Sequence, residues 1–353
     1  MKENWQKTLW GGGLTGIPFK KLTHTYQDII SLENLLLAWQ EFIIGKKHKK
    51  DVLEFQHNLF KNIYSLYQDL KNKIYSHGGY EAFNISDPKP RNIHKASVRD
   101  RLLHHAIYRI LYPYFDRKFI ADSYSCRIGK GTHKAINRFR SFVYKVSKNN
   151  TKTCWILKCD IKKFFASIDQ EILLYIFQKH LSGTDIIWLL EKVIKSFNSG
   201  NPIKGLPLGN LTSQLLVNIY MNEFDQFIKH KLKIKYYIRY ADDFVIFSEN
   251  KTYLLKIVRY IVQFLGEKLS LELHPNKVFI KTISSGVDFL GWFHFSDHRI
   301  LRTTTKRRML KSLGGNPSKS TIQSYLGLLE HGNNHKLKKI IDNNLISQNS
   351  DII

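Results

Sequence analysis

Asp242 and Asp243 are adjacent carboxylates at the centre of a hairpin-like pattern. A run of β-branched and aromatic residues precedes the pair at 234–240, and a second run follows it at 244–248. Two such runs with a very short polar break between them predict a β-hairpin that carries both carboxylates at its tip. Like charges this close repel and raise each other's pKa unless a cation neutralises them.

A third carboxylate, Asp160, ends another strand-like run at 155–160. If this strand neighbours the hairpin, three carboxylates converge on one point. Two-metal phosphoryl transfer needs such oxygen ligands, which hold hard cations roughly 3.5–4 Å apart. An Asp-Asp pair is also ordinary turn chemistry, because Asp tolerates the backbone angles of a turn. The pair alone therefore does not establish a site.

The charge of the chain points to a polyanionic partner. Lys and Arg number 55 against 29 Asp and Glu, which gives a net charge of +26 over 353 residues. Such an excess of positive charge causes self-repulsion, which is costly for a protein without a partner. The positive residues are spread along the chain. The distribution favours a long nucleic-acid channel over a basic tail. The length predicts about two domain-sized units, and 43% hydrophobic residues suffice for a substantial core.

Cysteine content and hydropathy exclude several other classes. Three cysteines with no CxxC motif and no paired histidine spacing predict neither a zinc site nor a disulfide framework. A reducing compartment follows as the default. No apolar run reaches transmembrane length, and the N-terminus lacks a signal-peptide pattern. We expect a cytoplasmic protein with no membrane partner.

The elements that must position the carboxylates follow from hydrophobic periodicity and turn residues. In the first part of the chain we expect an irregular lead-in at 1–24, helices over 25–73, a short hairpin at 80–94 and a helix after Ser97. The central part should contain the Asp160 strand, a helix through Leu173 and Phe177, and a loop at 205–214 that opens a long helix. After these we expect the 234–248 hairpin, a helix over 253–269, a strand after 273–277 and a tight turn at 287–292. The second helix of the 25–73 stretch presents Leu53, Phe60, Tyr64 and Tyr67 as its packing face. Beyond 299 the chain is basic and helical, with a capping box at Ser320–Gln323. The glycines at 129–131 lack P-loop spacing.

Several blocks in fixed order carry a family resemblance. They are DPKPR at 87–91, DRLLHHAI at 100–107, CDIKKFF at 159–165, GLPLGNLTSQLLVN at 205–218, YADD at 240–243, HPNK at 274–277 and FLGW at 289–292. Together these blocks resemble reverse transcriptases over residues 25–339. The resemblance implies an α+β right-hand polymerase with N-terminal helices and fingers at 25–150, a palm of antiparallel sheet and helices at 151–298, and a small helical basic thumb at 299–353.

The resemblance also implies the chemistry. Asp160, Asp242 and Asp243 would surround two Mg²⁺ ions that activate the primer 3′-hydroxyl and steady the departing pyrophosphate. The implied metal ligands are Asp160, Ile161, Asp242 and Asp243. Lys277 matches the lysine proposed to protonate pyrophosphate, although an exposed lysine is common without any role.

Further residues match the family's nucleotide and primer contacts. The implied nucleotide-binding residues are Arg91, Lys163, Phe164, Phe165, Leu208 and Gly209. Phe165 matches the aromatic gate that excludes a 2′-hydroxyl, and its alternative is an ordinary core aromatic. The implied primer grip is Phe289, Leu290 and Gly291. The implied partners are a template RNA, a cDNA or DNA primer, and dNTPs.

The loop before the long helix suggests a branch of the family. Most members carry Gln-Gly and Ser-Pro there, whereas this chain has Leu208-Gly209 and Ser213-Gln214. That departure resembles diversity-generating retroelement enzymes, which copy a template RNA with errors at adenines and work with a small basic accessory variability protein. A stand-alone group II-like, retron or phage-defence reverse transcriptase remains the alternative. A catalytically silent RNA-binding relative fits less well, because all three carboxylates are intact.

Overall fold

The computed structural model describes residues 21–86, 90–314 and 317–341, apart from 336 and 340. The chain divides into two compact units that interleave along the sequence. The first unit comprises residues 1–126, 161–235 and 261–274, and the second comprises 127–160, 236–260 and 275–353. Most of the predicted lead-in, the turn at 87–89 and residues 342–353 lie outside the described residues. The predicted fingers, palm and thumb boundaries are contiguous segments, and they remain predictions.

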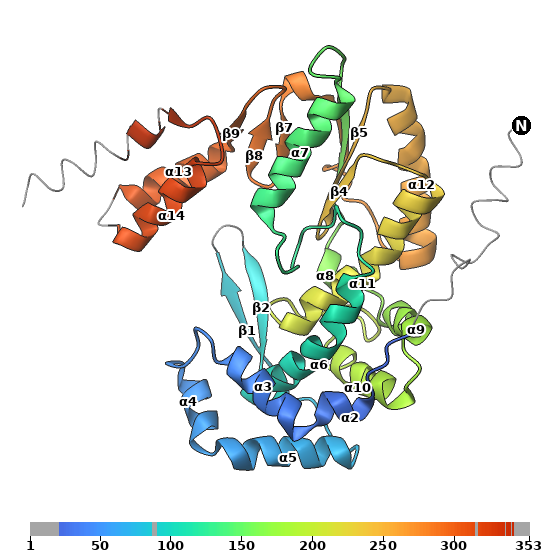
Figure 1. Cartoon of the computed structure of the whole chain (residues 1–353), viewed down its shortest axis with the longest axis vertical. Helices are drawn as coiled ribbons and strands as arrows, with labels where there is room; N and C mark the ends of the chain where they lie inside the picture. The colour runs from blue at the N-terminus through green and yellow to red at the C-terminus, as the bar shows by residue number, and fades with distance from the viewer. Residues whose placement is uncertain (1–20, 87–89, 315–316, 336, 340, 342–353) are drawn as a thin grey trace, which may run out of the picture. The chain divides into compact units, whose positions relative to one another are not determined.

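Helices form one side of the first unit (Figure 1). These helices are α2 (Tyr26–Ile30), α3 (Leu32–Phe42), α4 (Lys50–His57), α5 (Leu59–Lys71) and α6 (Val98–Asp116). The Ser97 hydroxyl caps α6 by accepting a hydrogen bond from the Asp100 amide. The predicted helix after Ser97 is thereby confirmed.

The predicted packing face of the second N-terminal helix is wrong. Leu53, Phe60 and Tyr64 are 52%, 76% and 54% exposed. The buried face of α5 carries aliphatic side chains instead, and these are Ile63, Leu66 and Leu70. Both faces have helical apolar spacing, so periodicity alone did not distinguish them.

The rest of the first unit surrounds a central buried helix. Strands β1 (Tyr80–Ile85) and β2 (Arg91–Ala96) form the predicted antiparallel hairpin. The remaining helices are α8 (Phe164–Ser167), α9 (Gln170–His180), α10 (Thr184–Ile194), α11 (Leu211–Gln226) and a π-helical turn at Phe227–Lys231. Most residues of α11 are buried, and they lie all round the helix, which is the pattern of a core helix. Sequence periodicity had not indicated α10.

The second unit contains a four-stranded antiparallel sheet. Its strands are β3 (Trp155–Cys159), β4 (Tyr237–Tyr240), β5 (Asp243–Ser248) and β6 (Phe279–Thr282), in the order β4-β5-β3-β6. Helix α7 (Thr132–Val146), which the sequence analysis missed, packs against β4 and β5 (Figure 1). The Phe139 ring of α7 lies 4.9 Å from the Phe247 ring of β5. Helix α12 (Lys251–Leu269) follows β5 and matches the predicted helix over 253–269.

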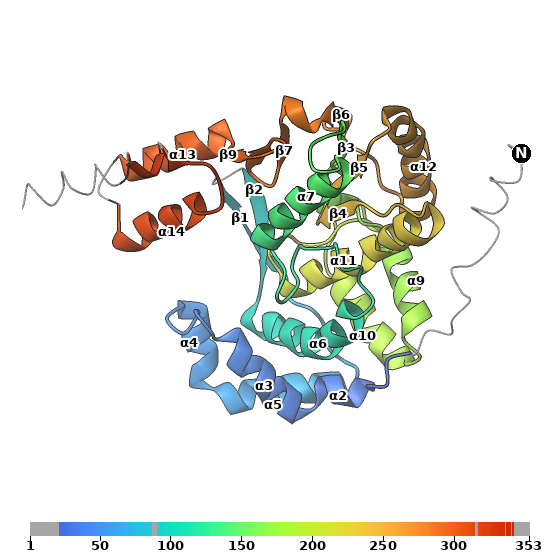
Figure 2. The ribbon, with the colours of Figure 1, turned by 45° about the horizontal axis from the view of Figure 1, so that its top comes forward.

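A second sheet and two helices complete this unit. Strands β7 (Val287–Phe289), β8 (Trp292–His294) and β9 (Arg299–Leu301) form an antiparallel sheet. Helices α13 (Thr303–Leu313) and α14 (Lys319–Leu329) lie side by side after it (Figure 2). Their apolar core includes Trp292 of β8 and Ile136 of α7. The predicted cap at Ser320 is wrong, because the Ser318 hydroxyl accepts from the Thr321 amide and begins α14 two residues earlier.

The mixture of helices and antiparallel sheets confirms the α+β class. Among the described residues, no helix combines the length and apolar character needed to cross a bilayer.

Candidate active site

The hairpin that carries Asp242 and Asp243 is present and is tighter than the sequence predicts, because Asp243 is already the first residue of β5. Tyr240 pairs with Asp243 across β4 and β5, so Ala241 and Asp242 alone form the turn. Ala241 adopts a left-handed backbone with φ of 55°. That conformation costs a non-glycine residue about 1 kcal/mol or more and is enriched at functional sites. The fully buried Arg239 side chain donates to the Ala241 carbonyl over 3.1 Å and anchors the turn.

The strand that ends at Asp160 is the direct neighbour of the hairpin. β3 pairs with β5 in antiparallel register, with Cys159 opposite Phe244. Continuing that register by one residue brings Asp160 beside Asp243. The condition that the sequence analysis set for the convergence of three carboxylates is therefore confirmed.

The carboxylates perturb one another. Burial, followed by the charges of Asp243 and Asp160, raises the pKa of Asp242 to about 6 against the opposing effect of Lys277. Burial also raises the pKa of Asp243, and Lys158 opposes that rise. Both pKa shifts show that the ionised carboxylates are disfavoured, because they are buried and lie near other negative charges.

Two lysines partly neutralise this charge. Lys277 donates from Nζ to both carboxylate oxygens of Asp160, over 3.1 and 3.2 Å. Lys158 Nζ lies 3.6 Å from Oδ1 of Asp243, which is an ion-pair distance and too long for a hydrogen bond. The predicted catalytic Lys277 thus contacts one of the predicted carboxylates directly.

The donor chemistry fits a hard divalent cation. Asp243 Oδ1 is buried and has no hydrogen-bond partner within the part of the chain that the structure describes, and carboxylate oxygens are the ligands that Mg²⁺ prefers. Within the described part of the chain, however, no three His, Cys, Asp or Glu side chains form a ready cluster for a metal ion. Ile161 belongs to the first unit, where it bridges to Leu273. The set of ligands therefore remains a prediction.

The predicted nucleotide-binding residues all belong to the first unit. Lys163 has a left-handed φ of 47° and begins α8, where Phe164 is buried and Phe165 is half-buried. The two rings meet edge to face at 5.6 Å. Phe165 is packed on Phe164 and partly exposed, and its role as the gate remains a prediction. Its main-chain carbonyl accepts from the Leu206 amide over 2.9 Å, so the 205–210 loop lies beside it.

The same loop contacts β2. The Leu208 carbonyl accepts from the His94 amide over 3.0 Å, and Asn210 donates to the His94 carbonyl over 2.8 Å. Gly209 has φ of 108°, and a Cβ there would lie 2.7 Å from Ile93, so this close approach requires glycine. Arg91, the first residue of β2, is exposed three residues before His94. The structure thus groups Leu208 and Gly209 with the strand that carries Arg91.

The predicted primer grip is a second tight turn of the second unit. Phe289 pairs with Trp292, which leaves Leu290 and Gly291 as the turn, with φ of 51° and 86°. Phe289 is fully buried, and its ring stacks on Phe139 at 5.4 Å. The predicted tight turn is confirmed, while the contact with a primer remains a prediction.

Two residues of the site were missed in the sequence. Lys158 is 8% exposed within β3, and Arg239 is completely buried within β4. Each interrupts a run of apolar residues in a buried strand, and buried cations rarely occur there without a partner. A charged residue inside a core strand was the available signal.

Comparison with known proteins gives a consistent picture. A family model described as reverse transcriptase (RNA-dependent DNA polymerase) matches residues 85–294. Protein YkfC of Escherichia coli is 24% identical over 63% of this chain and 66% of its own length. The group II intron-encoded protein LtrA of Lactococcus lactis is 22% identical over 87% of this chain and 61% of its own length. The chain spans less than two thirds of the length of these relatives.

Among solved structures, apo telomerase from Candida tropicalis aligns with a TM-score of 0.47 and 15% identity, covering 69% of this chain and 60% of that one. Telomerase from Candida albicans in complex with a fragment of telomeric RNA aligns with a TM-score of 0.47 and 12% identity. These alignments cover 66% of this chain and 46% of the second structure.

The raised pKa of Asp242 predicts a pH-dependent change in stability. Because the folded state holds its proton up to about pH 6 while the ordinary value is 3.8, stability falls as pH rises through that window. We expect Asp242→Asn to raise the free energy of unfolding by roughly 1–3 kcal/mol at pH 7, and by less than about 1 kcal/mol at pH 4. Urea denaturation with a chelator present measures both.

The matched control is Glu272→Gln, in an exposed residue whose pKa Lys162 lowers, so its substitution gives no gain. An Asp242→Asn variant no more stable than wild type at pH 7 would contradict the inferred cost of burying this carboxylate beside two others.

Proposed function

The chain belongs to the reverse transcriptase (RNA-dependent DNA polymerase) family, and from that premise we propose that it is an RNA-directed DNA polymerase. The fold class expected from sequence, an α+β right-hand polymerase, is that of this family. The observation that carries the proposal is the pairing of β3 with β5, which brings Asp160 beside the turn that carries Asp242 and Asp243. The net charge of +26 supports a nucleic-acid substrate.

The proposed reaction is attack of a primer 3′-hydroxyl on the α-phosphate of a dNTP, with pyrophosphate leaving. The three carboxylates would hold two Mg²⁺ ions, which supply activation of the hydroxyl and charge stabilisation at the pyrophosphate. Lys277, which donates a hydrogen bond from Nζ to Asp160, would act as the proton donor to the leaving pyrophosphate. Arg91 would bind the triphosphate through its guanidinium fork.

We further propose that the enzyme is an error-prone copier of a template RNA, of the diversity-generating retroelement type. The support is Leu208 in place of a polar residue and Ser213-Gln214 in place of Ser-Pro. A small basic accessory variability protein would be its partner. The alternative is a stand-alone group II-like enzyme. Its support is the similarity to LtrA over 87% of this chain.

Removing one carboxylate tests the activity. We expect Asp242→Asn to abolish primer extension in Mg²⁺ while RNA affinity stays within about twofold, because most affinity comes from Lys and Arg on phosphates. Primer extension measures activity, and filter binding measures RNA affinity. The matched control is Glu272→Gln, which also replaces a carboxylate by an amide. Full extension by Asp242→Asn would refute the assignment of the site.

Sugar selection tests Phe165. Phe165→Val should open space at the sugar and raise ribonucleotide incorporation relative to dNTP incorporation. A competition assay measures the ratio, and Tyr175→Ala, which removes an exposed aromatic of the same unit, is the control. If discrimination is the same in all three proteins, Phe165 is not the gate.

Fidelity tests the branch assignment. A leucine offers no hydrogen bond, and one lost polar contact corresponds to about 0.5–1.5 kcal/mol, or up to roughly tenfold in error rate. We expect Leu208→Gln to lower misincorporation, most visibly opposite template adenine, while polymerisation continues. Sequencing of cDNA from one RNA compares it with wild type and with Leu255→Gln, an exposed leucine on α12. Coincident error spectra would remove the support that Leu208 gives to the branch.

A further inference from the structure

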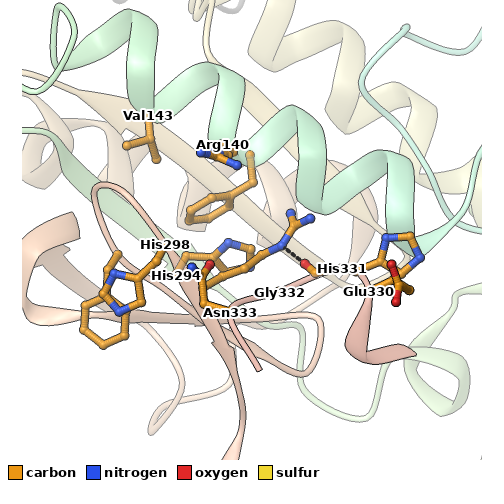
Figure 3. A pocket seen from close by; sticks show the side chains of 11 residues that line it. Arg140, Val143, His294, His298, Glu330, His331, Gly332 and Asn333 are labelled. Atoms are coloured by element: carbon orange, nitrogen blue, oxygen red, sulfur yellow. Dashed lines mark hydrogen bonds between the residues drawn. The ribbon is translucent and has the colours of Figure 1, made fainter. Parts of the chain in front are cut away.

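A pocket of about 180 Å³ lies within the second unit, and none of the predicted site residues lines it. Its walls come from α7, the β8–β9 connection and the segment after α14. Figure 3 shows Arg140 and Val143 of α7 on one side and His294, His298 and Asn333 on the other.

Arg299, the first residue of β9, brings a buried unsatisfied donor to this pocket. Its Nε donates to the His331 carbonyl, the dashed contact in Figure 3, and its Nη2 donates to Asn137 over 2.9 Å. Its Nη1 is buried and has no hydrogen-bond partner among the described residues. A buried charged donor without an acceptor is costly, so the position favours an acceptor from outside the protein.

Arg140 adds a second cation without a counter-charge. Its Nη2 donates to the main-chain carbonyl of Asp297 over 3.5 Å. Within the described residues, neither Arg140 nor Arg299 forms an ion pair with an acidic side chain. Glu330 also lines the pocket, but its carboxylate is bound by Lys338. Burial lowers the pKa of Arg299, and repulsion by Arg140 lowers it further, so the two guanidinium groups act on each other.

The histidines of the pocket report the same positive potential. Burial lowers the pKa of His294 to about 3, and Arg299 contributes to the shift. Burial, His133 and Arg299 lower the pKa of His331. Both shifts disfavour the charged imidazole, and Arg299 contributes to each of them.

The size of the pocket selects the ligand. Sites for drug-sized ligands measure roughly 300–1,000 Å³, so a pocket of about 180 Å³ suits a small oxyanion rather than a whole nucleotide. Guanidinium groups bind phosphate oxygens in a bidentate geometry, and arginine is favoured for phosphate recognition. We propose that Arg140 and Arg299 bind one backbone phosphate of the nucleic-acid strand in this pocket.

This inference rests on the proposed function, which supplies the strand. Most hydrogen bonds between proteins and DNA go to the sugar-phosphate backbone, and these contacts fix the register of the strand. The wall residue His294 contacts the Phe289 carbonyl through Nε2 over 3.3 Å. That hydrogen bond joins one wall of the pocket to the last residue of β7. Free phosphate has the same chemistry, and the experiment separates the two sources.

The test uses Arg140→Gln, because Arg140 is exposed and its loss leaves the contacts of Arg299 in place. The control is Lys145→Gln, which removes the same charge from an exposed position of the same helix outside the pocket. Binding of an RNA template annealed to a DNA primer, without dNTPs, is measured against salt concentration. We expect Arg140→Gln to weaken binding about tenfold and to reduce the slope of log K against log salt by about 1. Lys145→Gln should leave the slope unchanged, and Arg140→Lys should restore it.

Equal slopes for Arg140→Gln, Lys145→Gln and wild type would overturn the proposal. Phosphorus NMR with inorganic phosphate alone provides the second arm. If Arg140→Gln loses inorganic phosphate but keeps wild-type strand affinity and slope, the strand is excluded and the pocket takes free phosphate. Primer extension by wild type is scored separately. An inactive wild type with a reduced Arg140→Gln slope refutes only the proposed activity, whereas an active wild type with unchanged slopes refutes only the pocket.

Discussion

Repulsion among three carboxylates is the constraint on which the second unit depends. Pairing of β3 with β5 brings Asp160 beside the tip of the hairpin, where Asp242 and Asp243 already lie next to each other. This arrangement costs free energy, because burial and then the charges of Asp243 and Asp160 raise the pKa of Asp242. The main-chain ladder of the sheet must hold it, together with an arginine that fixes a left-handed Ala241.

Aromatic side chains of α7 pack against the sheet and support its hydrogen-bonded strands. Phe139 of α7 contacts Phe247 of β5 on one side and Phe289 of β7 on the other, at 4.9 and 5.4 Å between ring centroids. One side chain therefore joins the carboxylate sheet to the predicted primer grip. Aromatic pairs of this kind contribute roughly 0.5–1.5 kcal/mol each beyond the burial of their area. The same α7 adds Ile136 to the core under α13 and α14, so both sheets and the C-terminal helices depend on its face.

The sequence predicts well whatever depends on short-range chemistry. The Asp242 hairpin and the tight turn at 287–292 follow from turn residues between apolar runs, and both are present. Features that depend on which of two similar surfaces becomes buried were not predictable in this way. The face of α5 that carries Phe60 is as periodic as its buried face, and only tertiary packing distinguishes them. Lys158 was missed because its partner Asp243 is 85 residues away in sequence (243 minus 158) and adjacent only in the sheet.

The two lysines at the carboxylates differ in burial, and burial determines how firmly each is bound. Lys158 has a side chain only 10% exposed, so separating it from Asp243 would leave a buried charge unpaired. Lys277 has a side chain 46% exposed, and an ion pair so open to water contributes only about 0–1 kcal/mol. Lys158 is therefore held firmly beside Asp243. Lys277 can leave Asp160 at little cost in free energy. A cation that entered the site would therefore displace Lys277 from Asp160 more readily than Lys158 from Asp243.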